Sequence, residues 1–179
     1  MANKYEGTKT HANLEAAFSG ESQAHTKYAY FASVARKEGY QQIADIWEET
    51  SKNEKEHAKL WFKELELLGD TQANLIASAA GEHYEWSEMY PEFAKVAREE
   101  GFNEVAARFE MVAKVEQAHE ARYNTLREHL EEKKTFAGDA PEGWKCLNCG
   151  HIHTGENAPG VCPVCAHPQA YFERLARNY

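Results

Sequence analysis

Two Glu-x-x-His motifs constrain the fold of this 179-residue chain more than any other feature. Their residues, related by an offset of 62, are Glu54, His57, Glu116 and His119. Positions i and i+3 lie on one face of an α-helix, so each motif presents a carboxylate and an imidazole in the same direction. A further glutamate precedes each motif, Glu21 before the first and Glu82 before the second. Two such motifs and two such glutamates can hold two metal ions inside a bundle of four helices.

The hydrophobic pattern predicts four long helices that could form this bundle. Apolar residues recur at intervals of three and four residues, which is the spacing of one helical face. The stretches with this pattern span residues 14–31, 43–68, 75–93 and 105–130. The motif glutamates and histidines lie on the same faces, where burying a bare carboxylate costs on the order of several kcal/mol. A divalent metal is the simplest compensation for that cost.

Glycines punctuate the pattern, and an internal repeat relates its two halves. Gly39, Gly69 and Gly101 each follow a polar turn, as helix C-caps do, and therefore predict helix ends. Residues 31–39 resemble residues 93–101 at the same offset of 62. The expected architecture is a duplicated helical hairpin with pseudo-twofold symmetry.

The repeat is interrupted in the third predicted helix. Glu82 matches Glu21 at an offset of only 61, so one extra residue lies between Glu82 and Phe93. That interval contains Pro91 and predicts a π-bulge, a feature often found at functional sites. Glu85 lies there too, one turn after Glu82, and the first half has no glutamate at the equivalent place. By spacing alone, Glu85 is either an extra ligand or a solvated neighbour of the site.

All four cysteines of the chain lie near its C-terminus, in two Cys-x-x-Cys pairs. They are Cys146, Cys149, Cys162 and Cys165. This spacing predicts one four-cysteine metal site and leaves both iron and zinc open as its metal. The segment around it has too few apolar residues to fold without that metal. We expect a helical bundle over residues 1–135, a linker over 136–145, and a cysteine module over 146–179 whose pattern starts at Trp144.

The formal net charge of −9 argues against nucleic acid and against an anionic membrane surface as partners. No stretch approaches the roughly 18 apolar residues of a membrane-spanning helix. The first residues also lack the apolar segment of a signal peptide. The expected location is therefore the cytoplasm, where paired cysteines indicate metal binding rather than disulfides.

Taken together, the motifs resemble those of the rubrerythrins. They are Gly20-Glu-Ser-Gln23, Glu54-x-x-His57, Gly81-Glu-His-Tyr-Glu85 and Glu116-x-x-His119, followed by Cys-x-x-Cys-Gly and Cys-Pro-x-Cys. The resemblance covers essentially the whole chain and includes the domain order. It implies a mainly α fold, with a ferritin-like four-helix bundle and a small, β-rich, rubredoxin-like module at the C-terminus. The implied cofactors are two iron ions at a carboxylate-bridged di-iron site and one iron ion in a four-cysteine site.

The resemblance also implies the roles of the ligands, which would be the catalytic residues as well. Glu21 and Glu82 would be terminal ligands, one for each iron. Glu54 and Glu116 would bridge the two irons. His119 would complete the iron bound by Glu82, and Glu85 would be an additional ligand of the other iron. The histidines of the implied set are His57 and His119.

The implied activity is that of a non-haem di-iron peroxidase, which reduces hydrogen peroxide to water and protects anaerobic or microaerophilic cells from oxidative stress. A diferrous centre holds the two electrons that one peroxide molecule needs, and a closed iron site with four thiolates passes electrons singly. The implied partners are hydrogen peroxide, an electron donor (rubredoxin or an NAD(P)H-dependent reductase) and a second copy of the chain, sometimes with exchanged helices. Two alternatives use the same residues: a ferroxidase or iron-storage protein, and a non-catalytic metal-binding protein with a zinc ribbon.

Overall fold

The computed structural model describes residues 3–176. Residues 1–2 and 177–179, which the expected domains include, lie outside that range. The helices are α1 (Lys9–Lys37), α2 (Gln41–Glu64), α3 (Thr71–Tyr84), π-helical η1 (Glu85–Met89), α4 (Tyr90–Glu99) and α5 (Asn103–Glu131). The strands are β1 (Ala137–Cys146), β2 (Ile152–Asn157) and β3 (Phe172–Arg174), and a short 3-10 helix, η2 (Gln169–Tyr171), precedes β3. The chain divides between residues 70 and 71 into two compact units, each described by itself below.

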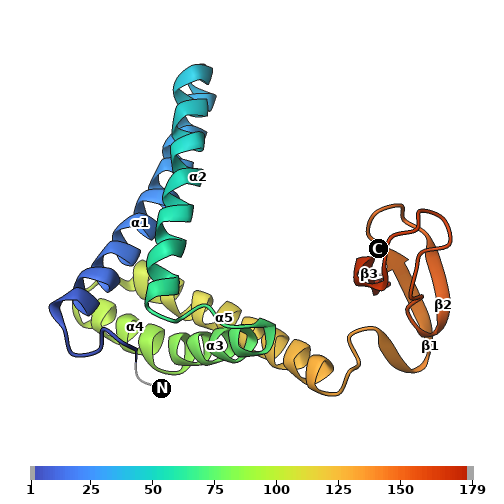
Figure 1. The fold of residues 1–179 in the computed structure, drawn as a ribbon. Helices are drawn as coiled ribbons and strands as arrows, with labels where there is room; N and C mark the ends of the chain where they lie inside the picture. The colour runs from blue at the N-terminus through green and yellow to red at the C-terminus, as the bar shows by residue number, and fades with distance from the viewer. Residues whose placement is uncertain (1–2, 177–179) are drawn as a thin grey trace. The chain divides into compact units, whose positions relative to one another are not determined.

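The first unit is an antiparallel hairpin of α1 and α2 (Figure 1). Its turn is a Schellman motif: Gly39 has a φ of +90°, and the Tyr40 N–H donates to the Ala35 carbonyl at 2.9 Å. Beside this turn the helices pack through small buried residues, covered by a tryptophan: Ala32, Ala35, Ala44 and Trp47. Alanines at the contact allow the two backbones to approach closely at the turn.

The second unit repeats this construction in α4 and α5. Gly101 has a φ of +89°, and the Phe102 N–H donates to the Ala97 carbonyl at 2.7 Å. The packed residues Ala94, Ala97, Ala106 and Phe109 follow their first-unit equivalents at an offset of 62 in every case. The duplicated hairpin expected from the sequence is therefore confirmed.

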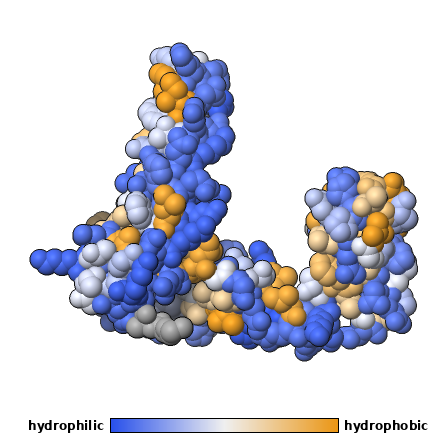
Figure 2. Space-filling view, viewed as in Figure 1, coloured by the Kyte–Doolittle hydropathy of each residue, from blue (hydrophilic) through white to orange (hydrophobic). Residues whose placement is uncertain are grey.

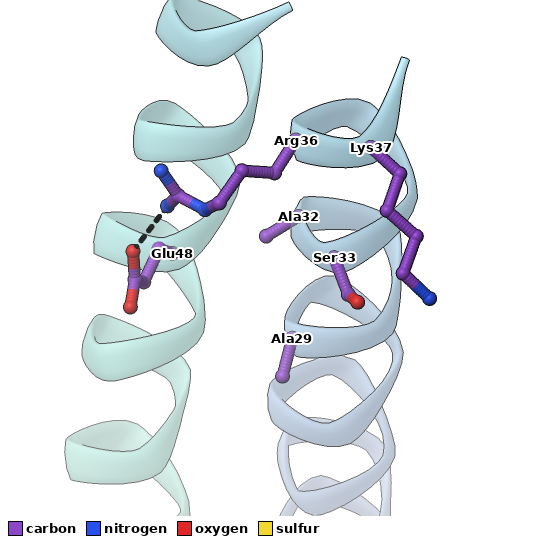
Figure 3. A pocket seen from close by; sticks show the side chains of 6 residues that line it. All are labelled: Ala29, Ala32, Ser33, Arg36, Lys37 and Glu48. Carbon is purple, nitrogen blue, oxygen red and sulfur yellow. Dashed lines mark hydrogen bonds and ion pairs between the residues drawn. The ribbon is translucent and has the colours of Figure 1, made fainter. Parts of the chain in front are cut away.

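An ion pair beside each turn is duplicated as well. Figure 3 shows Arg36 reaching from α1 toward α2, where its Nη2 lies 2.8 Å from Glu48 Oε2. In the second unit, Arg98 Nη2 lies 2.7 Å from Glu110 Oε1. Both pairs join the two helices of their own hairpin at matched positions.

The helix boundaries agree with the sequence pattern except at the end of α2. The predicted π-bulge is present as η1, and the predicted ends at Gly39 and Gly101 are correct. The end predicted at Gly69 is wrong, because α2 stops at Glu64 and Glu66 takes the left-handed conformation, with a φ of +58°. The helix ends there in a Schellman turn, in which the Leu67 N–H donates to the Phe62 carbonyl at 3.1 Å, and the side-chain amide of Asn3 donates to the exposed Glu64 carbonyl at 2.9 Å.

The C-terminal module is a three-stranded antiparallel sheet in the order β2-β1-β3. Its small core consists of Trp144, Cys146, Ala158, Cys162 and Phe172. Trp144 is fully buried, and its indole N–H donates to the Gly155 carbonyl at 3.0 Å. Strand β1 passes through most of the segment that the sequence suggested as a linker. The predicted fold class, mainly helical with a small β-rich module, is confirmed.

Each helical hairpin leaves part of its predicted apolar face exposed. Ile43 is 46% exposed in the first unit, and Leu126 is 47% exposed in the second. Two helices can cover only one side of each other, so a stripe of this width needs further helices to bury it. On the face seen in Figure 2, hydrophobic residues accordingly lie at the surface among hydrophilic ones. Within residues 3–176, no helix combines the length and apolar character needed to cross a membrane.

Candidate metal centres

The first unit brings three of the predicted ligands together. Glu21 comes from α1, and Glu54 and His57 come from one face of α2. His57 Nδ1 lies 2.8 Å from Glu54 Oε2 and 4.0 Å from Glu21 Oε1. One ligand atom from each of the three residues lies within 4.8 Å of the others. This grouping offers two carboxylates and one imidazole to a single ion.

The second unit forms a matching cluster from α3 and α5. His119 Nδ1 lies 2.6 Å from Glu116 Oε2 and 3.7 Å from Glu82 Oε1, and the three donors again fall within 4.8 Å. The carboxylates are well covered, with Glu116 14% and Glu82 19% exposed at the side chain. The two clusters therefore repeat the same chemistry in the same order along the chain.

Negative charge is concentrated at the second cluster. Burial raises the pKa of Glu82 above its ordinary value, and the neighbouring Glu116 raises it further. The pKa of the Tyr90 hydroxyl is also raised, first by burial and then by the charges of Glu85 and Glu116. A site that disfavours further negative charge in this way is one that a bound cation would stabilise.

Glu85 stands outside both three-residue clusters. It is the first residue of η1, and its charge raises the pKa values of both Glu82 and Tyr90, so its carboxylate lies near these groups. The structure thus groups six of the seven predicted ligands into two sets of three. The seventh, Glu85, adjoins the second set at the place where the helix departs from α geometry.

The four cysteines converge at one point of the module. Sγ of Cys146 lies 3.7 Å from Sγ of Cys165, and Sγ of Cys149 lies 3.6 Å from Sγ of Cys162. A tetrahedral metal with bonds of about 2.3 Å to sulfur requires sulfur–sulfur distances of about 3.8 Å. The cysteine set therefore fits one tetrahedral ion without rearrangement, as iron or zinc would require.

Two similar backbone turns present these thiols. The Gly150 N–H donates to the Cys146 carbonyl at 2.8 Å, and the Ala166 N–H donates to the Cys162 carbonyl at 2.9 Å. Both donors are left-handed, with φ values of +76° for Gly150 and +57° for Ala166. One pair, Cys146 and Cys162, is buried, whereas Cys149 is exposed and remains accessible from solvent.

Backbone N–H groups also act on the sulfur atoms. The His167 N–H, with help from neighbouring thiols, lowers the pKa of Cys165 to about 6. The His151 N–H acts in the same sense on Cys149, but burial and the adjacent sulfurs prevail and raise its pKa to about 12. These two thiols thus differ in how readily they lose their protons, and a bound metal ion would displace the protons from all four sulfurs.

The comparison with known families agrees with this ligand inventory. The family model described as rubrerythrin matches residues 12–127, and the model of the rubrerythrin rubredoxin-like domain matches residues 144–173. The chain belongs to the rubrerythrin family. The matched residues include all seven predicted Glu and His ligands and all four cysteines. The chain therefore has the donor sets for a di-iron site and one Cys-bound iron, and the family is of the di-iron oxidoreductase type with rubredoxin-like electron transfer.

Relatives match over nearly their full length. Rubrerythrin-1 of Clostridium acetobutylicum is 50% identical, with 97% of each chain covered. The rubrerythrin of Porphyromonas gingivalis is 48% identical, with all of this chain and 96% of that protein covered. Among solved structures, fully reduced, all-ferrous nigerythrin is 34% identical over 97% of this chain and 90% of its own, with a TM-score of 0.36.

One acidic residue beside the second cluster has no part in the rubrerythrin motifs quoted from the sequence. Glu120 follows His119 and accepts hydrogen bonds from Trp86 at 2.5 Å and from His83 at 3.1 Å. The Trp86 N–H, and to a smaller degree His83, hold the pKa of Glu120 below its ordinary value. The sequence analysis overlooked Glu120, because an acidic residue beside a predicted ligand has no periodic signature. The equivalent residue in the first half is Ala58, and this difference between the two halves could have drawn attention to Glu120.

Proposed function

We propose that this chain is a non-haem di-iron peroxidase that reduces hydrogen peroxide to water with electrons relayed through its rubredoxin-like site. The observation that carries the proposal is the presence of two matched Glu/Glu/His clusters and one four-cysteine cluster on a single chain. A pair of iron ions can deliver two electrons, and an iron held by four thiolates passes one at a time. That combination suits a substrate that takes up two electrons in each turnover.

The proposed di-iron ligands are the seven residues named from the sequence, of which the two clusters supply six. They are Glu21, Glu54, His57, Glu82, Glu85, Glu116 and His119. When bound, two ferrous ions supply the two electrons that, together with two protons, reduce one hydrogen peroxide molecule to two water molecules. The carboxylates hold the ions and balance their charge as it rises on oxidation.

Tyr90 is the proposed source of a proton close to the second cluster. Its hydroxyl is kept protonated by burial and by the nearby charges of Glu85 and Glu116, as its raised pKa indicates. Its ring is held by Phe93 and Phe109, with centroid distances of 6.3 Å and 5.9 Å. A fixed, protonated hydroxyl beside carboxylates can pass a proton to a departing oxygen and recover it from solvent.

The cysteine module is the proposed entry point for electrons. Four thiolates leave no open position on a tetrahedral ion, so this site exchanges electrons and does not bind peroxide. The exposed Cys149 provides a route from outside the module to its metal. The proposed external donor is rubredoxin or an NAD(P)H-dependent reductase.

We further propose that the chain acts as a homodimer, with helices exchanged between subunits. Support comes from the apolar faces that each hairpin leaves exposed by itself, including Phe31 at 44% and Phe93 at 45%. Large hydrophobic side chains left exposed on a helical face support an interaction site there. A second copy of the chain offers the complementary faces.

The peroxidase proposal is tested by mixing the anaerobically reduced, iron-loaded protein with one equivalent of hydrogen peroxide. We expect the di-iron centre to be oxidised within seconds, and the change in absorbance in a stopped-flow instrument measures this. The peroxide should be consumed and water formed. An iron centre that stays ferrous after this addition would contradict the peroxidase proposal.

The control separates the two metal sites. In Cys162→Ser the relay is lost, so steady-state turnover with a reductase should stop, whereas the single oxidation of a chemically reduced di-iron centre should proceed at the unsubstituted rate. Steady-state turnover that persists in a variant shown to lack the iron of the cysteine module would mean that electrons enter by another route.

A further inference from the structure

We propose that Glu120 is a positioning residue that holds the π-helical segment η1 against α5 and so fixes the place of the Glu85 carboxylate. The contacts that support this role lie entirely within the second unit, where α3 and α4 follow one another and both pack along α5 (Figure 1). The consequence for turnover rests on the proposed peroxidase function. The mechanical role of Glu120 does not.

One carboxylate holds two side chains that flank Glu85 in the sequence. Trp86 Nε1 donates to Glu120 Oε2 at 2.5 Å, and His83 Nδ1 donates to Glu120 Oε1 at 3.1 Å. The two rings meet edge to face, with 5.2 Å between their centroids. Each carboxylate oxygen therefore has its own partner, one before Glu85 and one after it. A charge-assisted pair of this kind restrains both position and rotation of the segment.

The π-helical segment depends on such an external contact. A π-turn inserts one residue into the helix, so the direction of its side chains is not fixed by the regular α-helical ladder. No residue of η1 is fully buried, and within residues 3–176 the buried hydroxyl of Ser87 has no hydrogen-bond partner. The indole of Trp86 is thus the main polar link from η1 to the neighbouring helix α5.

The clamp occurs in the half of the repeat that carries Glu85. At the offset of 62 that relates the two Glu-x-x-His motifs, the first half has Ala58 in place of Glu120. At the offset of 61 that relates Glu82 to Glu21, it has His25 in place of Trp86. His25 instead contacts a serine of α2, at 2.9 Å from its hydroxyl. An acidic clamp that served hairpin folding in general would be expected in both halves. Its presence beside the extra carboxylate assigns it to Glu85.

The first test measures the mechanical role in the oxidised, iron-loaded protein. Glu120→Ala should speed amide hydrogen exchange in residues 85–89 about tenfold, the effect of losing one charge-assisted hydrogen bond. Glu120→Gln keeps an oxygen that can accept from Trp86 and should retain most of the protection. The matched control is Glu110→Gln, which removes the carboxylate that pairs with Arg98 of α4 in the same hairpin. Unchanged exchange in Glu120→Ala, or an equal rise in Glu110→Gln, overturns the proposal.

The second test asks whether Glu120 acts through Glu85. Glu120→Ala should lower peroxide turnover about tenfold in the otherwise unsubstituted protein, as loss of a ligand-orienting group does. In the Glu85→Ala background the same change should lower it no further, because coupled positions are not additive. A full further loss in that background would overturn the positioning role. If the peroxidase proposal itself were wrong, the unsubstituted protein would fail to consume peroxide, yet the exchange difference would remain.

Discussion

At the scale of single residues, the side chain of Glu64 links the last turn of α2 to the N-terminal segment. Its side-chain oxygen Oε2 accepts from the Tyr5 hydroxyl at 2.8 Å and lies 3.2 Å from Lys4 Nζ. The Tyr5 hydrogen bond, followed by Lys4, lowers the pKa of this carboxyl. A carboxyl whose pKa is lowered on folding stabilises the folded state above its unfolded pKa, near 4.5. That contribution disappears as the pH falls through the lowered folded value.

We therefore expect Glu64→Gln to unfold at a lower temperature than the unsubstituted protein at pH 7. The difference should begin to shrink as the pH falls below about 4.5, and it should vanish below the lowered folded pKa of Glu64, where the carboxyl is protonated in both states. Thermal unfolding followed by circular dichroism at a series of pH values measures this difference. In a Tyr5→Phe background most of it should be gone. A difference that stays constant between pH 7 and pH 3 would contradict this account of Glu64.

At the scale of elements, the cysteine module differs from the hairpins in what stabilises it. Its core has few members, and two of them, Cys146 and Cys162, are themselves metal ligands. Apolar burial on this scale cannot offset the entropy of ordering a segment of this length, so bound metal must supply the remainder. The helices, by contrast, pack against each other over a greater length than the strands of the module, and each helix is stabilised by its own backbone hydrogen bonds.

Removal of the metal from the four-cysteine site should therefore unfold the module and spare the helices. In Cys162→Ser, or after chelation under reducing conditions, limited proteolysis should cut within residues 137–174 while helical circular dichroism is retained. Adding Zn²⁺ to the chelated protein should restore protection without restoring electron transfer, because zinc has no redox chemistry. A module that resists proteolysis without metal would show that its apolar core suffices.

At the scale of the whole molecule, each hairpin carries a metal cluster and an incompletely covered apolar face. A chain with two such hairpins can satisfy both faces by association with a second copy. Duplication favours this outcome, since the two halves present related surfaces at a sequence offset of 62. The proposed homodimer with exchanged helices makes a prediction about mixed subunits.

The Glu54→Ala and Glu116→Ala chains should each bind the two iron ions poorly when refolded alone. Refolding the two variants together should restore iron binding. If helices are exchanged, mixed dimers contain one intact centre, so an equal mixture should recover about a quarter of the normal centres. Iron analysis with the diferric absorption spectrum measures this, and sedimentation gives the subunit number. Dimers without recovery would show that each chain completes its own centre. A monomeric protein would show that the dimer proposal is wrong.

The sequence by itself determined the metal-binding motifs and the repeat. Glu54 and His57 share a face because three residues make most of one helical turn, whatever the helix packs against. The four cysteines were equally readable, since their short spacing fits a common metal-binding turn. The extra residue before Phe93 predicted the π-helix, because a one-residue insertion must be accommodated within the helix.

Only the tertiary structure decided the contacts that join distant segments. Gly69 suggested the end of α2, but the helix ends at Glu64, where Asn3 and Tyr5 bind Glu64 across a separation of about sixty residues. The contact between Glu120 and Trp86 likewise depends on how η1 is rotated against α5. Local periodicity reports which face of a helix is apolar, and it carries no information on which polar side chains of two packed helices meet.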